Sequence, residues 1–154
     1  MNQAKDAITL LTQDHKEVKK AFKEYEALGE RAFVAKKKLA NEICVALTVH
    51  AQVEEEIFYP AVRKAISQGA DMIDEATVEH ASAKELIAQI LSMGADEDLF
   101  DATVKVLSEQ IDHHAGEEEE EMFAKARKSK LDLVSLGQEI AARKEALEAK
   151  SFTI

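Results

Sequence analysis

The chain has 154 residues, of which 46% are hydrophobic and 32% charged, and it carries a formal net charge of −10. This length suits one domain that buries its own core, and the acidity argues against nucleic acid or an anionic membrane as a partner. Five glycines, one proline and no tryptophan form a composition typical of all-helical proteins. No stretch approaches the roughly 18 apolar residues of a membrane-spanning helix, so we expect no membrane segment.

Cysteine usage and the first residues predict the compartment. A single cysteine, Cys44, leaves no partner for a disulfide within the chain, which suits a reducing environment. The N-terminal residues lack the basic start and the apolar run of a secretory signal peptide. We therefore expect a cytoplasmic protein.

Breaks near Gly29, in segment 67–71 and in segment 93–96 interrupt the helical periodicity of the chain. The intervals between them predict helices over residues 5–28, 31–67, 71–92, 97–128 and 132–150. Asp71 and Asp132 are placed to cap the third and the last of these helices. Pro60 removes one backbone donor late in the second helix, so we expect a kink or an early end there.

Short connections between long helices favour antiparallel neighbours. The predicted fold is therefore all-α: an up-down-up-down four-helix bundle over about residues 5–128, with an additional C-terminal helix over about 132–150. The whole chain, 1–154, forms a single domain in this interpretation. The last helix either packs along the outside of the bundle or makes an oligomer contact, and its pattern does not decide between the two.

Matched residues in the two halves of the predicted bundle indicate an internal repeat. Three pairs are separated by 64 or 65 residues: His15 with His80, His50 with His114, and Glu54 with Glu118. Apolar residues lie at helical spacings of three, four or seven positions from these histidines, which points the imidazoles into the bundle. Each glutamate follows a histidine by four residues and therefore shares its inward face.

Two buried carboxylates cost several kcal/mol unless positive charge accompanies them. A lone histidine on an apolar helix face is more often a hydrogen-bonded core residue than a ligand. Here one histidine on each of four helices, with two glutamates in register, favours a metal site between the helices. The predicted metal ligands are His15, His50, Glu54, His80, His114 and Glu118.

Some neighbouring residues are ambiguous. His113 and Glu117 have the same spacing as His114 and Glu118, although the repeat favours His114 as the ligand. Glu121 lies seven residues after His114, so it is a candidate for an extra ligand or a supporting acid.

Other neighbours are expected to play no part in the site. Glu55 and Glu119 are expected to turn towards solvent. Ideal helical geometry points Tyr59 away from the His50 face, so we expect it to be a packing residue. Lys19 and Lys84 are expected to pair with acidic residues near the bundle mouth.

Several motifs together resemble the hemerythrin-like, or HHE cation-binding, family over about residues 8–125. They are Asp14-His15-Lys16-Glu17-Val18, His50-x-x-x-Glu54-Glu55 with Phe58-Tyr59-Pro60, Glu79-His80, and His114-x-x-x-Glu118-Glu119 with Met122-Phe123. The resemblance implies a four-helix bundle around two non-haem Fe ions with carboxylate and oxo or hydroxo bridges (Fe-O-Fe or Fe-OH-Fe). It favours iron, while the ligand types alone leave Zn and Mn open.

One departure from the oxygen-carrying hemerythrins bears on function. Those proteins have a second histidine four residues after the first on the third helix, where this chain has Lys84. A protonated lysine cannot ligate a metal. The resemblance therefore implies two histidines per iron, bridging by Glu54 and Glu118, and one open position on each metal.

Open coordination positions predict a protein that binds or senses a small ligand such as O2, peroxide or nitric oxide. The alternatives are a redox enzyme acting on peroxide, oxygen or nitric oxide, an iron-handling protein, and a helical interaction module without metal. No catalytic residue is assigned.

Overall fold

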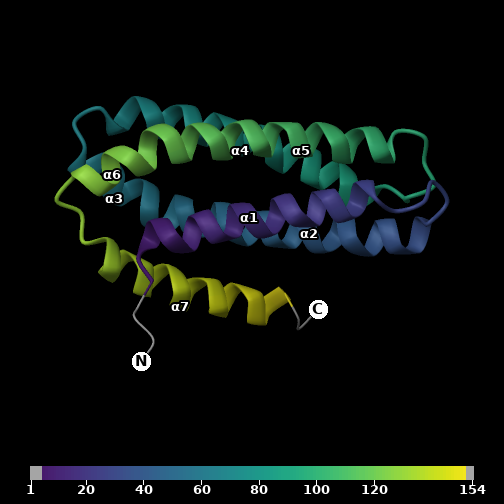
Figure 1. The fold of residues 1–154 in the computed structure, drawn as a ribbon, viewed down its shortest axis with the longest axis horizontal. Helices are drawn as coiled ribbons and strands as arrows, with labels where there is room; N and C mark the ends of the chain where they lie inside the picture. The colour runs from purple at the N-terminus through teal and green to yellow at the C-terminus, as the bar shows by residue number, and fades with distance from the viewer. Residues whose placement is uncertain (1–4, 152–154) are drawn as a thin grey trace.

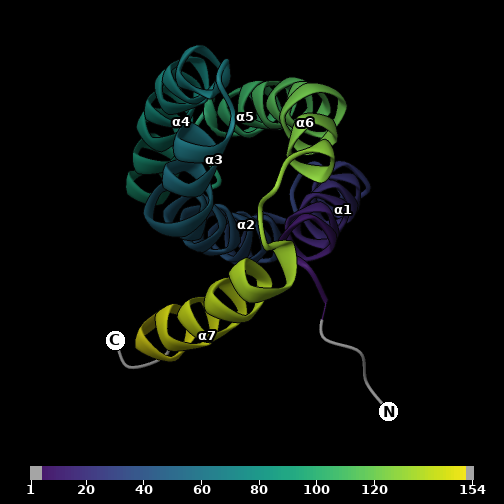
Figure 2. The same ribbon diagram turned by 90° about the vertical axis from the view of Figure 1, so that its left-hand side faces the viewer.

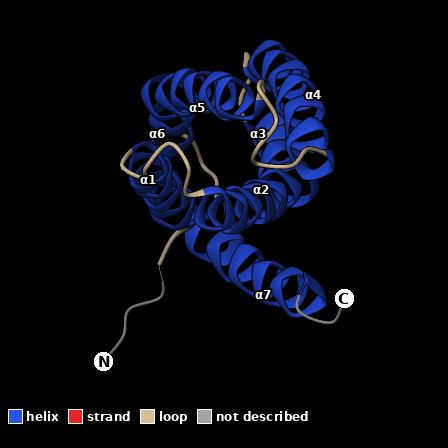
Figure 3. Cartoon of the chain, turned by 90° about the vertical axis from the view of Figure 1, so that its right-hand side faces the viewer, coloured by secondary structure: helices blue, strands red, loops and turns tan. Residues whose placement is uncertain are grey.

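The computed structural model describes residues 5–151, and this part of the chain contains helices and loops but no strand (Figure 3). In chain order the helical segments are α1 (Ala7–Glu26), α2 (Phe33–Val53), a first π-helical turn (Glu54–Phe58), α3 (Tyr59–Ala65), α4 (Gly69–Ser92), α5 (Phe100–Glu117), a second π-helical turn (Glu118–Phe123), α6 (Ala124–Lys128) and α7 (Leu133–Ser151). Within the described range, no helix combines the length and the apolar character needed to cross a membrane.

The segments form four antiparallel rods: α1, α2 continued by α3, α4, and α5 continued by α6 (Figure 1). Helix α7 lies outside this bundle, against α1 and α2 (Figure 2). The predicted four-helix bundle with an additional C-terminal helix is therefore confirmed, and α7 packs along the outside of the bundle.

Helix ends follow local capping chemistry. Asp6 begins α1 by accepting a hydrogen bond from the backbone N–H three residues later, at 2.8 Å. Asp132 does the same for α7 at 3.0 Å, as predicted. The predicted cap at Asp71 is wrong, because α4 begins earlier, at Gly69, and Asp71 lies in its first turn. There its negative charge still favours the positive end of the helix dipole.

Pro60 does not end the second rod. A π-helical turn precedes it, in which the backbone N–H of Tyr59 reaches the carbonyl oxygen of Glu54, five residues earlier. Pro60 is then the second residue of α3, where a missing N–H costs little. The rod continues to Ala65.

The core consists of two apolar clusters. One lies at the end of the bundle near α7 and includes Leu11, Val53 and Phe58, while the other lies towards the opposite end and includes Phe22 and Phe100. Full burial of a large apolar side chain contributes about 1.5–3 kcal/mol. Between the clusters lies a layer of buried polar residues, and this layer forms the candidate site.

Helix α7 approaches α1 very closely at Gly137. A Cβ atom at this position would lie 2.9 Å from the backbone nitrogen of Ala7 and closer still to the carbonyl oxygen of Lys5. Side-chain apolar contacts from Ile140 and Leu147 hold the same helix on the bundle. Only glycine permits this approach, because backbone atoms cannot move aside as a flexible side chain can.

Replacement of Gly137 by alanine should therefore destabilise the protein by about 1–3 kcal/mol, the usual cost of overpacking. Denaturant unfolding followed by circular dichroism measures the change. Gly29→Ala is the control, because a Cβ at Gly29 meets nothing within 4 Å and the substitution should be neutral or slightly stabilising. Equal stability of the Gly137→Ala variant and the wild type would show that α7 does not need this contact.

Candidate metal centre

The six residues predicted to ligate metal meet in the polar layer between the two apolar clusters. Each of the four rods contributes one histidine. The rod of α2 and α3 and the rod of α5 and α6 also contribute one glutamate each, the first residue of the π-helical turn. All six side chains are buried, and Glu54 has no exposed surface. Their sources are His15 of α1, His50 of α2, His80 of α4, His114 of α5, and Glu54 and Glu118 of the first and second π-helical turns.

Each glutamate lies between two imidazoles. Glu54 Oε1 is 3.3 Å from His50 Nε2 and 3.2 Å from His80 Nε2. The Glu118 oxygens lie 3.2 Å from His15 Nε2 and 3.4 Å from His114 Nε2. Ligand atoms about 2.1 Å from one metal lie about 3 Å apart when they are adjacent, so these separations suit shared metal ions.

The donor atoms fall into two groups whose members lie within 4.8 Å of one another. The first group contains His15, His50, Glu54 and Glu118, and the second contains Glu54, His80 and His114. Glu54 therefore belongs to both groups, the position that a bridging carboxylate occupies in a dinuclear site.

Four buried atoms in this layer have no hydrogen-bond partner: His15 Nε2, His50 Nε2, Glu54 Oε2 and Glu118 Oε1. Leaving a buried polar atom without a partner costs about 1–3 kcal/mol. All four belong to the first donor group. Imidazole nitrogen and carboxylate oxygen are ligands of iron, zinc and manganese, so these residues fit a bound cation.

The charges of the buried residues in this layer also favour a bound cation. Burial lowers the pKa of His50, but the Glu54 and Asp14 carboxylates outweigh it and hold that pKa well above its usual value. Burial likewise opposes the charged form of His114, yet Glu118 and Glu54 raise its pKa to about 9. Burial would raise the pKa of Glu54, but His50 keeps it well below its usual value. The layer therefore requires positive charge, which protons supply when no metal is bound.

Each histidine also has a carboxylate on its outer nitrogen. The Nδ1 atoms lie 2.6–2.8 Å from these oxygens, so Nε2 faces the centre in every case. Such partners orient metal-binding histidines and raise their basicity. The pairs are His15 with Glu119, His50 with Asp14, His80 with Glu55, and His114 with Glu79.

Glu55 and Glu119 turn away from the centre with side chains 32% and 41% exposed, as predicted, but each also contacts the outer nitrogen of a histidine, which was not predicted. Each follows an inward glutamate by one residue, which directs it towards the neighbouring helix and the back of a histidine there. The four pairs obey the internal repeat, since Asp14 and Glu79 each precede a histidine. In the sequence, these outer acids could have been recognised from two repeated dipeptides: an acid before His15 and His80, and a second glutamate after Glu54 and Glu118.

Tyr59 is the main residue that sequence reasoning missed. Its hydroxyl donates to Glu118 Oε2 at 2.5 Å and lies 3.2 Å from both Glu54 Oε1 and His80 Nε2. The π-helical turn inserts about one extra residue, which rotates Tyr59 inward by about 100° relative to an ideal α-helix. Burial and the charges of Glu54 and Glu118 raise the pKa of Tyr59 well above its usual range, so without a metal it is a hydrogen-bond donor.

The ambiguous residues lie outside the centre. The His113 side chain is 66% exposed and pairs with Glu117 at 3.1 Å. Glu121 is exposed and lines a surface cleft instead of joining either donor group. Lys84 pairs with Glu55 at 2.8 Å and Lys19 with Asp112 at 3.7 Å, so both lysines bind acids as predicted.

Comparisons with known proteins agree with this geometry. The family model of the hemerythrin HHE cation binding domain matches residues 6–126. A protein of Nostoc sp. described as a DNA nickase is 28% identical over 118 residues, which are 77% of this chain and 32% of that protein. The chain thus spans about a third of the length of that curated relative.

A similar solved structure is the crystal structure of a hemerythrin HHE cation binding domain-containing protein from Mycobacterium kansasii. The match has a TM-score of 0.83 and covers 97% of this chain and 91% of the other, at 22% sequence identity. At that identity the likeness supports the fold alone, including the helix outside the bundle. The family match over residues 6–126, most of the chain, shows that this chain belongs to the hemerythrin HHE cation-binding domain family.

Proposed function

We propose that the chain holds two non-haem iron ions in the polar layer and binds O2 or a related small ligand there. The observation that carries the proposal is the meeting of six buried donors in two groups that share Glu54. His15 and His50 would hold one iron, and His80 and His114 the other, with Glu54 and Glu118 between them. Iron so bound supplies reversible redox chemistry and open coordination positions.

An apolar cavity beside the four histidines supports a small uncharged ligand. Its volume is about 30 Å³, which is room for a molecule about the size of water. Val18, Leu47, Ala83, Ile87 and Ile111 contribute to its walls. Polar residues also line the cavity, but nearly all of its accessible wall is apolar, which favours an uncharged diatomic ligand over an ion.

A redox enzyme acting on peroxide is the second candidate, and Tyr59 is the observation that favours it. The phenol donates a hydrogen bond to Glu118 and lies 3.2–3.4 Å from the Nε2 atoms of His80 and His114. The second donor group has three members against four in the first, so Tyr59 would complete it or supply a proton beside it. The equivalent position in the second half is Phe123, which stacks on His15 instead.

Metal content tests the ligand assignment. Glu54→Ala should remove both irons, because Glu54 belongs to both donor groups, and His80→Ala should remove at most one. Elemental analysis of protein purified without chelators measures the ratio. His113→Ala is the control, since this exposed histidine lies outside the centre, and it should keep two irons. Full iron content in Glu54→Ala would show that the assignment is wrong.

Cavity filling tests small-ligand binding. Anaerobic reduction followed by exposure to air should change the visible charge-transfer bands of the iron-loaded protein. Ala83→Leu should keep the iron but slow this change, because the longer side chain fills the cavity. Ala40→Leu is matched to it, as another buried alanine that lies outside the cavity. A spectrum of the wild type that air leaves unchanged would exclude the binding of oxygen.

Tyr59→Phe distinguishes the enzyme from the binding protein. The variant should retain two irons, while peroxide consumption should fall by about 100-fold if the hydroxyl supplies a proton. Tyr25→Phe is the control, because Tyr25 bonds to Asp101 in the apolar cluster far from α7. Steady-state peroxide assays provide the rates. Wild-type consumption no faster than that of free iron would exclude the enzyme.

A further inference from the structure

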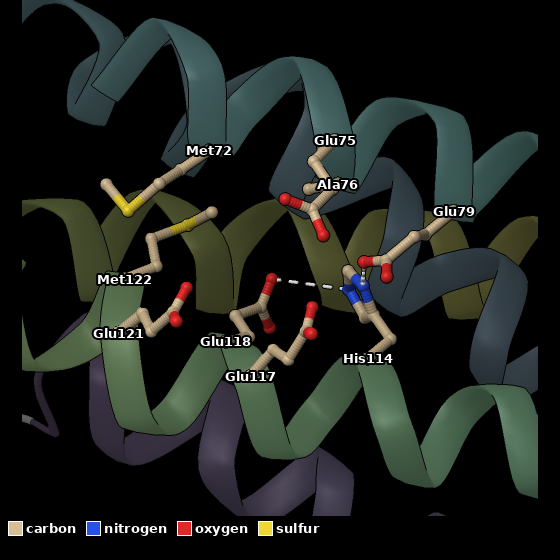
Figure 4. Close-up of a pocket in the computed structure, with 9 residues that line it drawn as sticks. All are labelled: Met72, Glu75, Ala76, Glu79, His114, Glu117, Glu118, Glu121 and Met122. Atoms are coloured by element: carbon tan, nitrogen blue, oxygen red, sulfur yellow. Dashed lines mark hydrogen bonds and ion pairs between the residues drawn. The ribbon is translucent and has the colours of Figure 1, made fainter. Parts of the chain in front are cut away.

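A narrow cleft opens on the surface between α4 and the junction of α5 with the second π-helical turn (Figure 4). Its volume is about 30 Å³. Glu75 and Glu79 project from α4, and Glu117 and Glu121 face them from the rod of α5 and α6. Two residues of the centre, His114 and Glu118, also line the cleft. The cleft therefore connects an acidic surface with the buried donors.

Beside this cleft lies a third group of metal-binding side chains, Glu79, His113 and Glu117. One donor atom from each lies within 4.8 Å of the others, and His113 Nε2 is 3.1 Å from Glu117 Oε1. The His113 side chain is 66% exposed, so the group is accessible from solvent. Two carboxylates and an imidazole suit a divalent transition metal.

Glu79 belongs to both environments. Its Oε2 atom is 4.0 Å from His113 Nε2 on the surface, while its Oε1 atom is 2.6 Å from His114 Nδ1. Behind it, Glu118 is 3% exposed and also lines the cleft. Its Oε1 atom has no hydrogen-bond partner and lies 3.2 Å from His15 Nε2. A cation at the surface group would thus lie beside a cleft whose lining includes a carboxylate of the centre.

Charge distinguishes this cleft from the other grooves that reach residues of the site. The groove that reaches His15 carries Lys16, Lys19 and Lys23, and the groove that reaches Asp14 carries Lys20 and Lys144. The cleft at Glu118 has no lysine or arginine in its lining. Clefts lined by charge of one sign concentrate oppositely charged ions and raise their rate of association.

We propose that Glu79, His113 and Glu117 form a docking site for a divalent cation, which the acidic cleft then leads to the buried centre. This proposal rests on the proposed function, because a loading site requires a centre to load. The docked cation displaces no ligand of the centre, and it enters as a divalent ion without any change of oxidation state. His113 thereby gains a role although it does not ligate the centre.

The test is the rate at which metal-free protein takes up Co²⁺, whose visible absorption reports entry into a site of nitrogen and oxygen donors. The double variant His113→Gln/Glu117→Gln should load at least about fivefold more slowly, because it loses both docking and steering. Its end point should equal that of the wild type, since neither residue lies in the centre. Glu120→Gln removes one exposed charge from the same acidic run outside the cleft and should load at the wild-type rate.

Two further measurements keep the docking site separate from the centre. Glu75→Gln/Glu121→Gln should also load slowly and should weaken the dependence of the rate on salt. In the protein as purified, Mn²⁺ should broaden the backbone amide resonances of residues 113 and 117, and His113→Gln should abolish this effect.

The outcomes separate the two proposals. Wild-type loading rates in both double variants, or no broadening by Mn²⁺, would overturn the docking site. If the wild type bound no Co²⁺ even after long incubation, the proposed centre would instead be overturned. This outcome is measured as the amount of cobalt bound per chain, not as a loading rate.

Discussion

The burial of two carboxylates between two apolar clusters is the constraint on which the rest of the structure depends. Glu54 and Glu118 are 0% and 3% exposed, and four imidazoles surround them. A buried carboxylate without compensating charge costs several kcal/mol. Either protons on the histidines or a bound cation must supply that charge. Since the layer separates the two halves of the core, cation binding and packing of the bundle are energetically linked.

The π-helical turns determine which side chains face this layer. Both begin at an inward glutamate, so the repeat in the sequence is also a repeat in backbone geometry. Wider turns of this kind are frequent at functional sites. They rotate Tyr59 and Phe123 inward at equivalent positions, but only one of these side chains has a hydroxyl group. The two donor groups therefore differ chemically although the fold makes them nearly symmetric.

The repeat allowed the fold and the meeting of six side chains to be predicted from sequence. The offsets of 65 residues between His15 and His80 and of 64 between Glu54 and Glu118 can be read without exact helix boundaries, because they depend only on which face is buried. Tyr59 was missed because an ideal angle of 100° per residue does not hold across a π-helical turn. The outer acids were missed for a different reason. Their roles depend on side chains of neighbouring helices, and periodicity within one helix carries no information about those.

Helix α7 supports the centre from one side of the bundle. It covers α1 and α2, and its Lys144 Nζ lies 2.5 Å from Asp14 Oδ1, while Asp14 Oδ2 holds His50. Burial would raise the pKa of Asp14, but His50 and Lys144 lower it, so the carboxylate stays charged behind His50. The face formed by α4 and α5 lies away from this helix (Figure 2). A positive charge from α7 therefore supports one side of the layer, while the cleft between α4 and α5 has no lysine or arginine in its lining and attracts cations.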